Sequence, residues 1–145
     1  MDFQDCVRFA NENPLCHVAT VDGDQPRVRM LIMWFADESG FYFQTQSVKA
    51  LCKQIKNNPK VELCFYAPRT DSPVGKMLRV SGEAEILNDM AIRARAIKER
   101  PQVKRWGIEK PEDPLLEVFR IYTGEAHLWT TEYNLRESEI ERIKF

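Results

Sequence analysis

Residues 26–35 alternate like a β-strand, yet both faces of that strand are apolar beyond Arg29. A strand that is apolar on both faces is normally covered on both. A small barrel buries only its interior, so the outer face needs another partner. We expect a second copy of the chain, because closed two-fold dimers are the commonest assembly. One face carries Val28, Met30, Ile32 and Trp34; the other carries Arg27, Arg29, Leu31, Met33 and Phe35.

The rest of the chain predicts short antiparallel strands with helices between them. Apolar alternation predicts strands at 15–21, 26–35, 41–45, 60–67, 78–86, 115–122 and 125–131, and helical spacing predicts helices at 2–13, 48–57 and 88–100. The last two strands are expected to form a hairpin around Thr123-Gly124, and residues 134–145 fit either a short helix or a strand. About seven short strands favour a mainly β fold with flanking helices, an antiparallel split barrel, because closure removes exposed edges.

Composition limits the class of protein. With 145 residues, 43% hydrophobic and 30% charged, we expect one soluble domain spanning residues 1–145. The apolar run at 30–36 is too short to cross a bilayer, and no basic and apolar leader opens the chain. A net charge of -1 argues against nucleic acid as a partner. We expect a cytoplasmic protein.

The four cysteines indicate neither disulfides nor a metal site. They form no C-x-x-C motif, and their spacing does not suit zinc. Three of them lie in apolar periodic segments, which predicts small core residues in a reducing compartment. The positions are Cys6, Cys16, Cys52 and Cys64.

The most distinctive polar residues gather around the predicted hairpin and the helix after it. Arg29 lies on the long strand, Thr45 ends the returning strand, and Ser47 and Lys49 open the helix. Ser47 is predicted to cap that helix, whose free N–H groups suit an anion. Lys49 is disfavoured by the helix dipole, and a bound phosphate would remove that penalty.

Ordinary surface roles remain open for the same residues. Arg27 and Arg29 could pair with Asp22, Asp24 or another acid, and Lys49 belongs to a solvent-facing lysine stripe. No set of nucleophile, base and acid is visible, so the sequence does not identify the catalytic residues.

Five short motifs occur in order: RMLIM from Arg29, QT from Gln44, SVK from Ser47, NNP from Asn57 and RVSGEA from Arg79. Their order and spacing resemble the pyridoxamine 5'-phosphate oxidase-like family of FMN-binding split barrels. The resemblance covers roughly residues 14–87, and more loosely the segment through Trp129.

The resemblance implies a homodimer that holds FMN at its interface. Arg29 and Lys49 look like ligands of the FMN phosphate, with Ser47 nearby. The backbone of Met30, Leu31 and Ile32 would run beside the isoalloxazine ring. Gln44 and Thr45 match the pair that touches the ring and ribityl chain, and Trp129 would reach the flavin across the dimer.

Departures from the family pattern indicate which branch of the family the chain resembles. Trp34 stands where the oxidase has a lysine, Val48 where it has an arginine, and Met77 where it has a glutamine. Residues 134–145 lack the oxidase's arginine-rich segment. The chain is therefore more similar to the short, general branch of flavin reductases and nitroimidazole-resistance-type proteins than to the vitamin B6 oxidase.

The resemblance implies an FMN-dependent oxidoreductase with an unidentified small substrate and NADH or NADPH as candidate electron donor. One alternative is a flavin-binding or electron-carrier protein without catalysis. Another is the same fold with a deazaflavin or haem, although neither His17 nor His127 has an obvious axial-ligand context.

Overall fold

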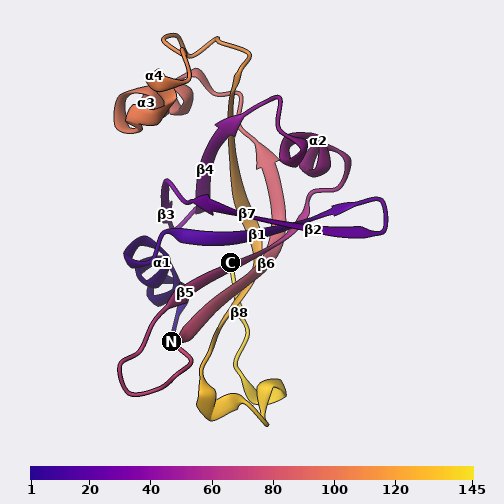
Figure 1. Cartoon of the computed structure of the whole chain (residues 1–145), viewed down its shortest axis with the longest axis vertical. Helices are drawn as coiled ribbons and strands as arrows, with labels where there is room; N and C mark the ends of the chain where they lie inside the picture. The colour runs from indigo at the N-terminus through magenta and orange to yellow at the C-terminus, as the bar shows by residue number, and fades with distance from the viewer.

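The chain folds around one curled antiparallel sheet (Figure 1). The computed structural model describes residues 1–145. The strand order is β2-β1-β5-β6-β7-β4-β3, and β8 pairs with β7. The strands are β1 (Leu15–Asp22), β2 (Gln25–Ile32), β3 (Phe35–Asp37), β4 (Gly40–Gln46), β5 (Lys60–Ala67), β6 (Lys76–Ile86), β7 (Leu116–Trp129) and β8 (Ile143–Lys144).

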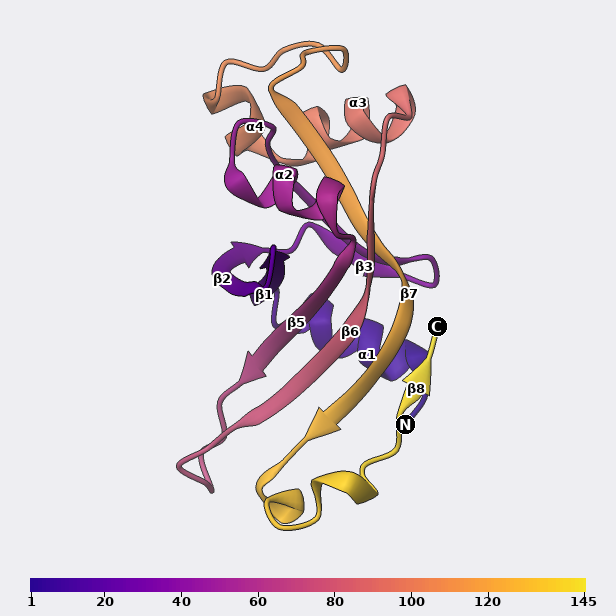
Figure 2. The ribbon, with the colours of Figure 1, turned by 90° about the vertical axis from the view of Figure 1, so that its right-hand side faces the viewer.

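Four α-helices accompany the sheet, and two short 3₁₀ turns follow β7. In Figures 1 and 2, α3 and α4 lie together at one end of the molecule, α1 lies beside the barrel and α2 lies above the β1–β2 hairpin. The helices are α1 (Phe3–Glu12), α2 (Ala50–Asn57), α3 (Met90–Glu99) and α4 (Pro101–Arg105). No helix is long and apolar enough to span a membrane.

The mainly β, split-barrel prediction is confirmed. β2 and β3 end the strand order and do not pair with each other, so the barrel is open between them. Alternation on β1, β4, β5, β6 and β7 fills the interior with large residues that are fully buried: Val18, Phe43, Leu63, Leu78 and Phe119. Every second residue of these strands points away from the core. On β2, β1, β5, β6 and the later half of β7, these residues together form the outer face of the sheet.

The long strand predicted at 26–35 is broken. β2 ends at Ile32 and β3 begins at Phe35, because the chain turns a corner of the barrel at Met33 and Trp34. Met33 is 1% exposed and fills the core there. The Trp34 N–H donates to the Tyr42 carbonyl oxygen at 2.8 Å, which ties the corner to β4.

The hairpin predicted around Thr123-Gly124 is also wrong, because β7 passes through these residues as one strand of 14 residues. Gly124 lies opposite Gly82 in the β6–β7 ladder, next to an irregularity between Glu83 and Ala84. A Cβ atom on Gly124 would lie 2.1 Å from the Ser81 carbonyl oxygen. The glycine therefore permits close strand approach rather than a turn.

Other predicted segments are confirmed, with small shifts at their ends. The strand at 60–67 matches β5, and Asp2 and Asp5 form a capping box that starts α1. Cys6, Cys16 and Cys52 are buried and all four cysteines are free thiols. The C-terminal segment ends as a strand, because Lys144 pairs with Glu125 of β7.

Candidate functional site

Arg29 lies on the inner face of β2, and its side chain reaches α2. Its Nη1 donates to the Thr20 hydroxyl oxygen at 2.7 Å and to the Val18 carbonyl oxygen at 3.3 Å. Its Nη2 donates to Gln54 Oε1 at 2.5 Å. All three acceptors are neutral, so the guanidinium is oriented without being neutralised.

The two arginines of β2 differ in their charge partners. Arg27 pairs with Asp22 across the hairpin at 3.3 Å, which is an ordinary surface ion pair. Arg29 has no carboxylate within ion-pair distance. Burial lowers the pKa of Arg29, and repulsion from Arg27 lowers it further. An anion beside Arg29 would therefore meet an uncompensated, half-buried positive charge.

The start of α2 differs from the prediction. Lys49, not Ser47, is the residue before the first helical turn, and it makes no side-chain capping bond. Ser47 donates its hydroxyl to the Pro114 carbonyl oxygen at 2.7 Å, and its N–H donates to the Leu115 carbonyl oxygen at 2.8 Å. Because no side chain caps α2, backbone N–H groups of its first turn remain available to an anion. Lys49 is exposed beside them.

The backbone of β2 offers further hydrogen-bonding groups at the open edge of the barrel. β2 pairs only with β1, starting from Asp22 opposite Gln25 at the hairpin turn. In an antiparallel ladder the N–H and C=O groups of alternate residues point away from the partner strand. The backbone N–H and C=O groups of Met30 and Ile32 accordingly point to the open edge of the barrel. The side chain of Leu31, between them, packs against the core.

Gln44 and Thr45 are both buried, but they lie on opposite faces of β4. Thr45 faces the barrel interior and its Oγ1 has no hydrogen-bond partner. Gln44 faces α4, where its Nε2 lies 3.0 Å from the Gln102 side-chain oxygen when that amide is suitably oriented. The Gln44 Oε1 has no partner. The two side chains therefore do not point into one pocket within a single chain.

Trp129 lies far from the other predicted residues. It is the last residue of β7 and pairs with Met77, on the outer face of the sheet. Val118, which pairs with Gln44, is eleven positions earlier on the same strand. At about 3.3 Å per residue, this is roughly 36 Å along the strand. One chain alone therefore does not bring Trp129 to Gln44, and Arg29 lies on β2, four strands away from β7 in the strand order.

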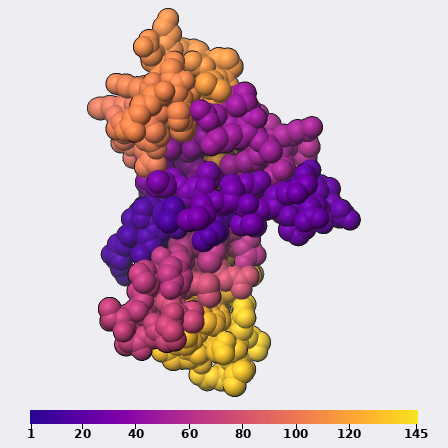
Figure 3. Space-filling view, in the orientation of Figure 1, coloured from indigo at the N-terminus to yellow at the C-terminus, as the bar shows by residue number.

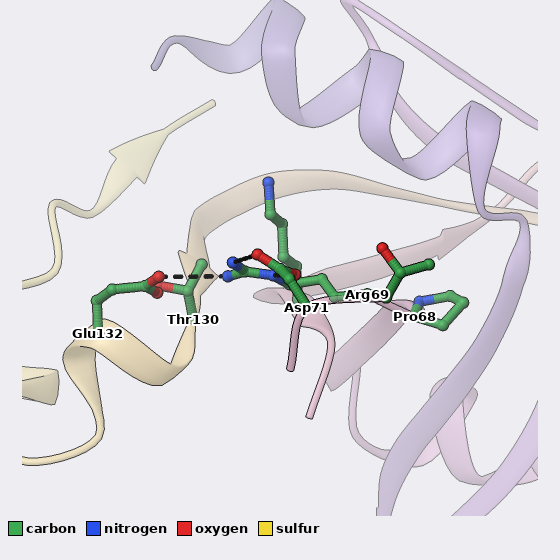
Figure 4. Close-up of a pocket in the computed structure, with 7 residues that line it drawn as sticks. Pro68, Arg69, Asp71, Thr130 and Glu132 are labelled. Atoms are coloured by element: carbon green, nitrogen blue, oxygen red, sulfur yellow. Dashed lines mark hydrogen bonds and ion pairs between the residues drawn. The ribbon is translucent and has the colours of Figure 1, made fainter. Parts of the chain in front are cut away.

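A surface hollow of 810 Å³ also lies at the Trp129 end, where Thr130 forms part of its wall. Figure 4 shows Arg69 between two acids in this hollow, bound to Asp71 at 2.6 Å and to Glu132 at 3.3 Å. These contacts compensate its charge. A smaller hollow of 470 Å³ lies between the β1–β2 turn and α2, and Lys53, Gln54 and Asn57 contribute to its wall.

Sequence reasoning missed Thr20 and Gln54. Both interrupt apolar patterns: Thr20 follows Cys16 and Val18 on the inner face of β1, and Gln54 lies among the apolar positions of α2. A polar residue on a buried face needs a partner. That signal could have marked both residues, although not Arg29 as their common partner.

Comparison with known proteins gives the family. The family model described as pyridoxamine 5'-phosphate oxidase matches residues 3–130. The chain belongs to the pyridoxamine 5'-phosphate oxidase family. The pyridoxine/pyridoxamine 5'-phosphate oxidase of Shewanella frigidimarina is 36% identical over 104 residues, covering 69% of this chain and 46% of that protein. The enzyme of the same name from Mesorhizobium japonicum is 30% identical over 123 residues, covering 83% and 57%. The chain thus spans about half the length of these family members.

Solved structures with a similar fold match nearly the whole chain. A NimC/NimA family protein from Clostridium acetobutylicum has a TM-score of 0.78 at 24% identity, covering 98% of this chain and 92% of that one. General Stress Protein 26 of Bacillus anthracis has a TM-score of 0.73 at 19% identity, with both chains fully covered. HutZ, the haem storage protein of Vibrio cholerae, has a TM-score of 0.65 at 16% identity, covering 90% and 95%.

Proposed function

We propose that this family member is an FMN-dependent oxidoreductase that works as a homodimer in the cytoplasm. The observation that carries the proposal is Arg29, whose half-buried guanidinium is held by neutral acceptors and has no carboxylate partner. Membership of the pyridoxamine 5'-phosphate oxidase family supports a flavin as the ligand. A phosphate group would supply the negatively charged partner that Arg29 lacks.

The residues around Arg29 fit the parts of FMN. Arg29 and the uncapped start of α2, with Lys49 beside it, would bind the phosphate. The free backbone edge of β2 at Met30 and Ile32 would hydrogen-bond the polar edge of the ring. The flavin, when bound, supplies hydride and electron transfer, so the chain need only bind, orient and shield it.

A second copy of the chain is the proposed cover for the outer face of the sheet. Several large apolar side chains there are exposed in the single chain: Leu15 by 51%, Val28 by 68%, Met30 by 49%, Ile32 by 56% and Tyr66 by 42%. Figure 3 shows the tip of the β1–β2 hairpin projecting from the side of the molecule. Sedimentation should give twice the chain mass of 17.0 kDa, and a monomer at micromolar concentration would contradict the dimer.

Haem is the second ligand to consider, because a similar fold occurs in HutZ. His127 is the buried histidine of this chain, and its Nδ1 contacts the Arg142 guanidinium. Since that guanidinium can only donate, the proton of the neutral ring lies on Nε2. A protonated Nε2 has no lone pair for iron, so this geometry favours flavin.

The absorption spectrum of the purified protein tests the ligand. We expect flavin bands, or quenching of FMN fluorescence on titration when the flavin has been lost. A Soret band would indicate haem instead, and a colourless protein without FMN binding would refute the proposal. Anaerobic bleaching by NADH or NADPH would separate an oxidoreductase from a passive flavin carrier.

Arg29→Met and Arg27→Met form a matched pair for the phosphate assignment. Charge-assisted hydrogen bonds contribute about 1.5–3 kcal/mol each, so Arg29→Met should weaken FMN binding by roughly 10- to 100-fold. Arg27→Met removes the same charge from the same strand face and should change the affinity by less than about threefold. Equal effects of the two substitutions would show that Arg29 does not bind the phosphate.

A further inference from the structure

Arg29, Thr20 and Gln54 form a closed triangle of hydrogen bonds between β1, β2 and α2. Gln54 Oε1 accepts from Arg29 at 2.5 Å and from the Thr20 hydroxyl at 2.6 Å. The Thr20 oxygen in turn accepts from Arg29 at 2.7 Å. Thr20 is 2% exposed and Gln54 is 8% exposed, so both acceptors are held in fixed positions.

The neutral acceptors of Arg29 contrast with the carboxylates that pair with two other half-buried arginines, whereas the buried Arg93 also binds only backbone carbonyls. Arg79 binds Glu62 at 2.6 Å, and Arg120 contacts Glu85. A glutamate at position 54 would have almost the same shape as Gln54 and would complete an equivalent ion pair with Arg29. The chain instead carries the amide, which orients the guanidinium and leaves its charge available.

A hollow beside the triangle provides space for a ligand. Gln54 forms part of the wall of the 470 Å³ hollow between the β1–β2 turn and α2, together with Lys53 and Asn57. Asp22 is also part of this wall, but its carboxylate pairs with Arg27. The wall therefore combines amides with one lysine, and the charge of its one aspartate is compensated by Arg27, so Lys53 remains free to attract an anion.

We infer that Gln54 and Thr20 are positioning residues that hold Arg29 without neutralising it and thereby make the site prefer a phosphorylated flavin over riboflavin. This inference rests on the proposed function, because it assumes that Arg29 binds the flavin phosphate. It adds the reason why the position facing Arg29 carries an amide and not a carboxylate.

Gln54→Glu is the decisive substitution, measured by fluorescence titration with FMN and, separately, with riboflavin. The new carboxylate should pair with Arg29 and compete with the phosphate. We expect roughly 10- to 100-fold weaker FMN binding and a change of less than about threefold for riboflavin. Gln25→Glu adds the same charge at the exposed hairpin and should leave the ratio of the two affinities unchanged.

Thr20→Val provides a second route if the Gln54→Glu protein does not fold. It removes one acceptor of Arg29 while keeping the side-chain shape, and it should lower the FMN-to-riboflavin preference. Thr20→Ser keeps the hydroxyl and should restore the preference. The thermal midpoint without flavin, measured for each variant, separates loss of folding from loss of selectivity.

The outcomes distinguish this inference from the proposed function. If the wild-type protein binds no FMN, the proposed function fails and the inference fails with it. If the wild type binds FMN but a folded Gln54→Glu variant keeps the same FMN-to-riboflavin preference, only the inference is overturned. Equal loss of both flavins would also overturn it, because Gln54 would then shape the pocket as a whole.

Discussion

Arg93 gives the sharpest stability prediction. Its side chain is 6% exposed and donates to three carbonyl oxygens, those of Pro111 at 2.5 Å, Asp113 at 2.9 Å and Leu116 at 3.1 Å. These bonds fix the segment that connects α4 to β7. Ser47 binds the same segment, so Arg93 also supports the chain where it enters α2.

Arg93→Met keeps most of the aliphatic stem and removes the three donors. Hydrogen bonds to a charged donor contribute about 1.5–3 kcal/mol each to folding stability. The sum over three such bonds exceeds the loss of stability that a single substitution normally causes. Losses above about 4–5 kcal/mol are exceptional, and water can reach part of the loop, so we expect the free energy of unfolding to fall by about 3–5 kcal/mol.

Urea unfolding, followed by tryptophan fluorescence at fixed protein concentration, measures this loss. Lys98→Met is the matched control, because Lys98 lies on the same helix, is exposed and has no ion-pair partner. It should change the free energy of unfolding by less than about 0.5 kcal/mol. A loss below about 1 kcal/mol for Arg93→Met would refute the reasoning, since the three carbonyls would then be satisfied without the guanidinium.

Two further predictions concern the sheet. Gly124→Ala should lower the free energy of unfolding by about 3 kcal/mol or more, because φ is +156° and the new Cβ would meet Ser81. Gly23→Ala, which has open space around the new Cβ, should lower it by only about 1–2 kcal/mol. Similar thermal midpoints for the two variants would contradict this prediction. Burial and the cations of Arg142 and Arg79 lower the pKa of His127, so the unfolded chain binds more protons below about pH 6.5 and stability should fall as the pH drops through that value. Urea titrations at pH 7.5 and 5.5 should show a smaller difference for His127→Gln, and an unchanged difference would exclude this cause.

Local pattern predicted most strands because alternation is a short-range property. The strand at 60–67 and the alternation at 78–86 required only their own residues. The break at Met33 and the continuity at Gly124 both depend on neighbours distant in sequence. Met33 turns inward because the barrel curls at that point, and Gly124 passes close to β6 because Gly82 lies opposite it. Thr-Gly is a turn signal when only local preference acts.

The candidate site likewise contains residues that local sequence could predict and contacts that only the fold determines. Arg29 could be predicted from its place on an apolar strand and from the family resemblance. The helix cap predicted for Ser47 is wrong, because its hydroxyl donates to the carbonyl oxygen of Pro114, a residue 67 positions away. The triangle with Thr20 and Gln54 likewise joins positions 9 and 25 residues from Arg29. Contacts at such distances follow from the fold and not from local spacing.

The strand order offers a way for Trp129 to belong to the proposed flavin site. Trp129 and the apolar side of β2 lie on the same outer face, at opposite ends of the order β2-β1-β5-β6-β7. In a two-fold dimer, each contact between different residues occurs twice. If the axis of the proposed dimer runs along β5, the central strand, then β2 of one copy faces β7 of the other. Trp129→Leu should then raise the fluorescence of bound FMN, because the indole no longer quenches it, while the phosphate contact at Arg29 preserves most of the affinity. An axis across the strands would place β2 over β2, and the same substitution would leave the fluorescence of the bound flavin unchanged.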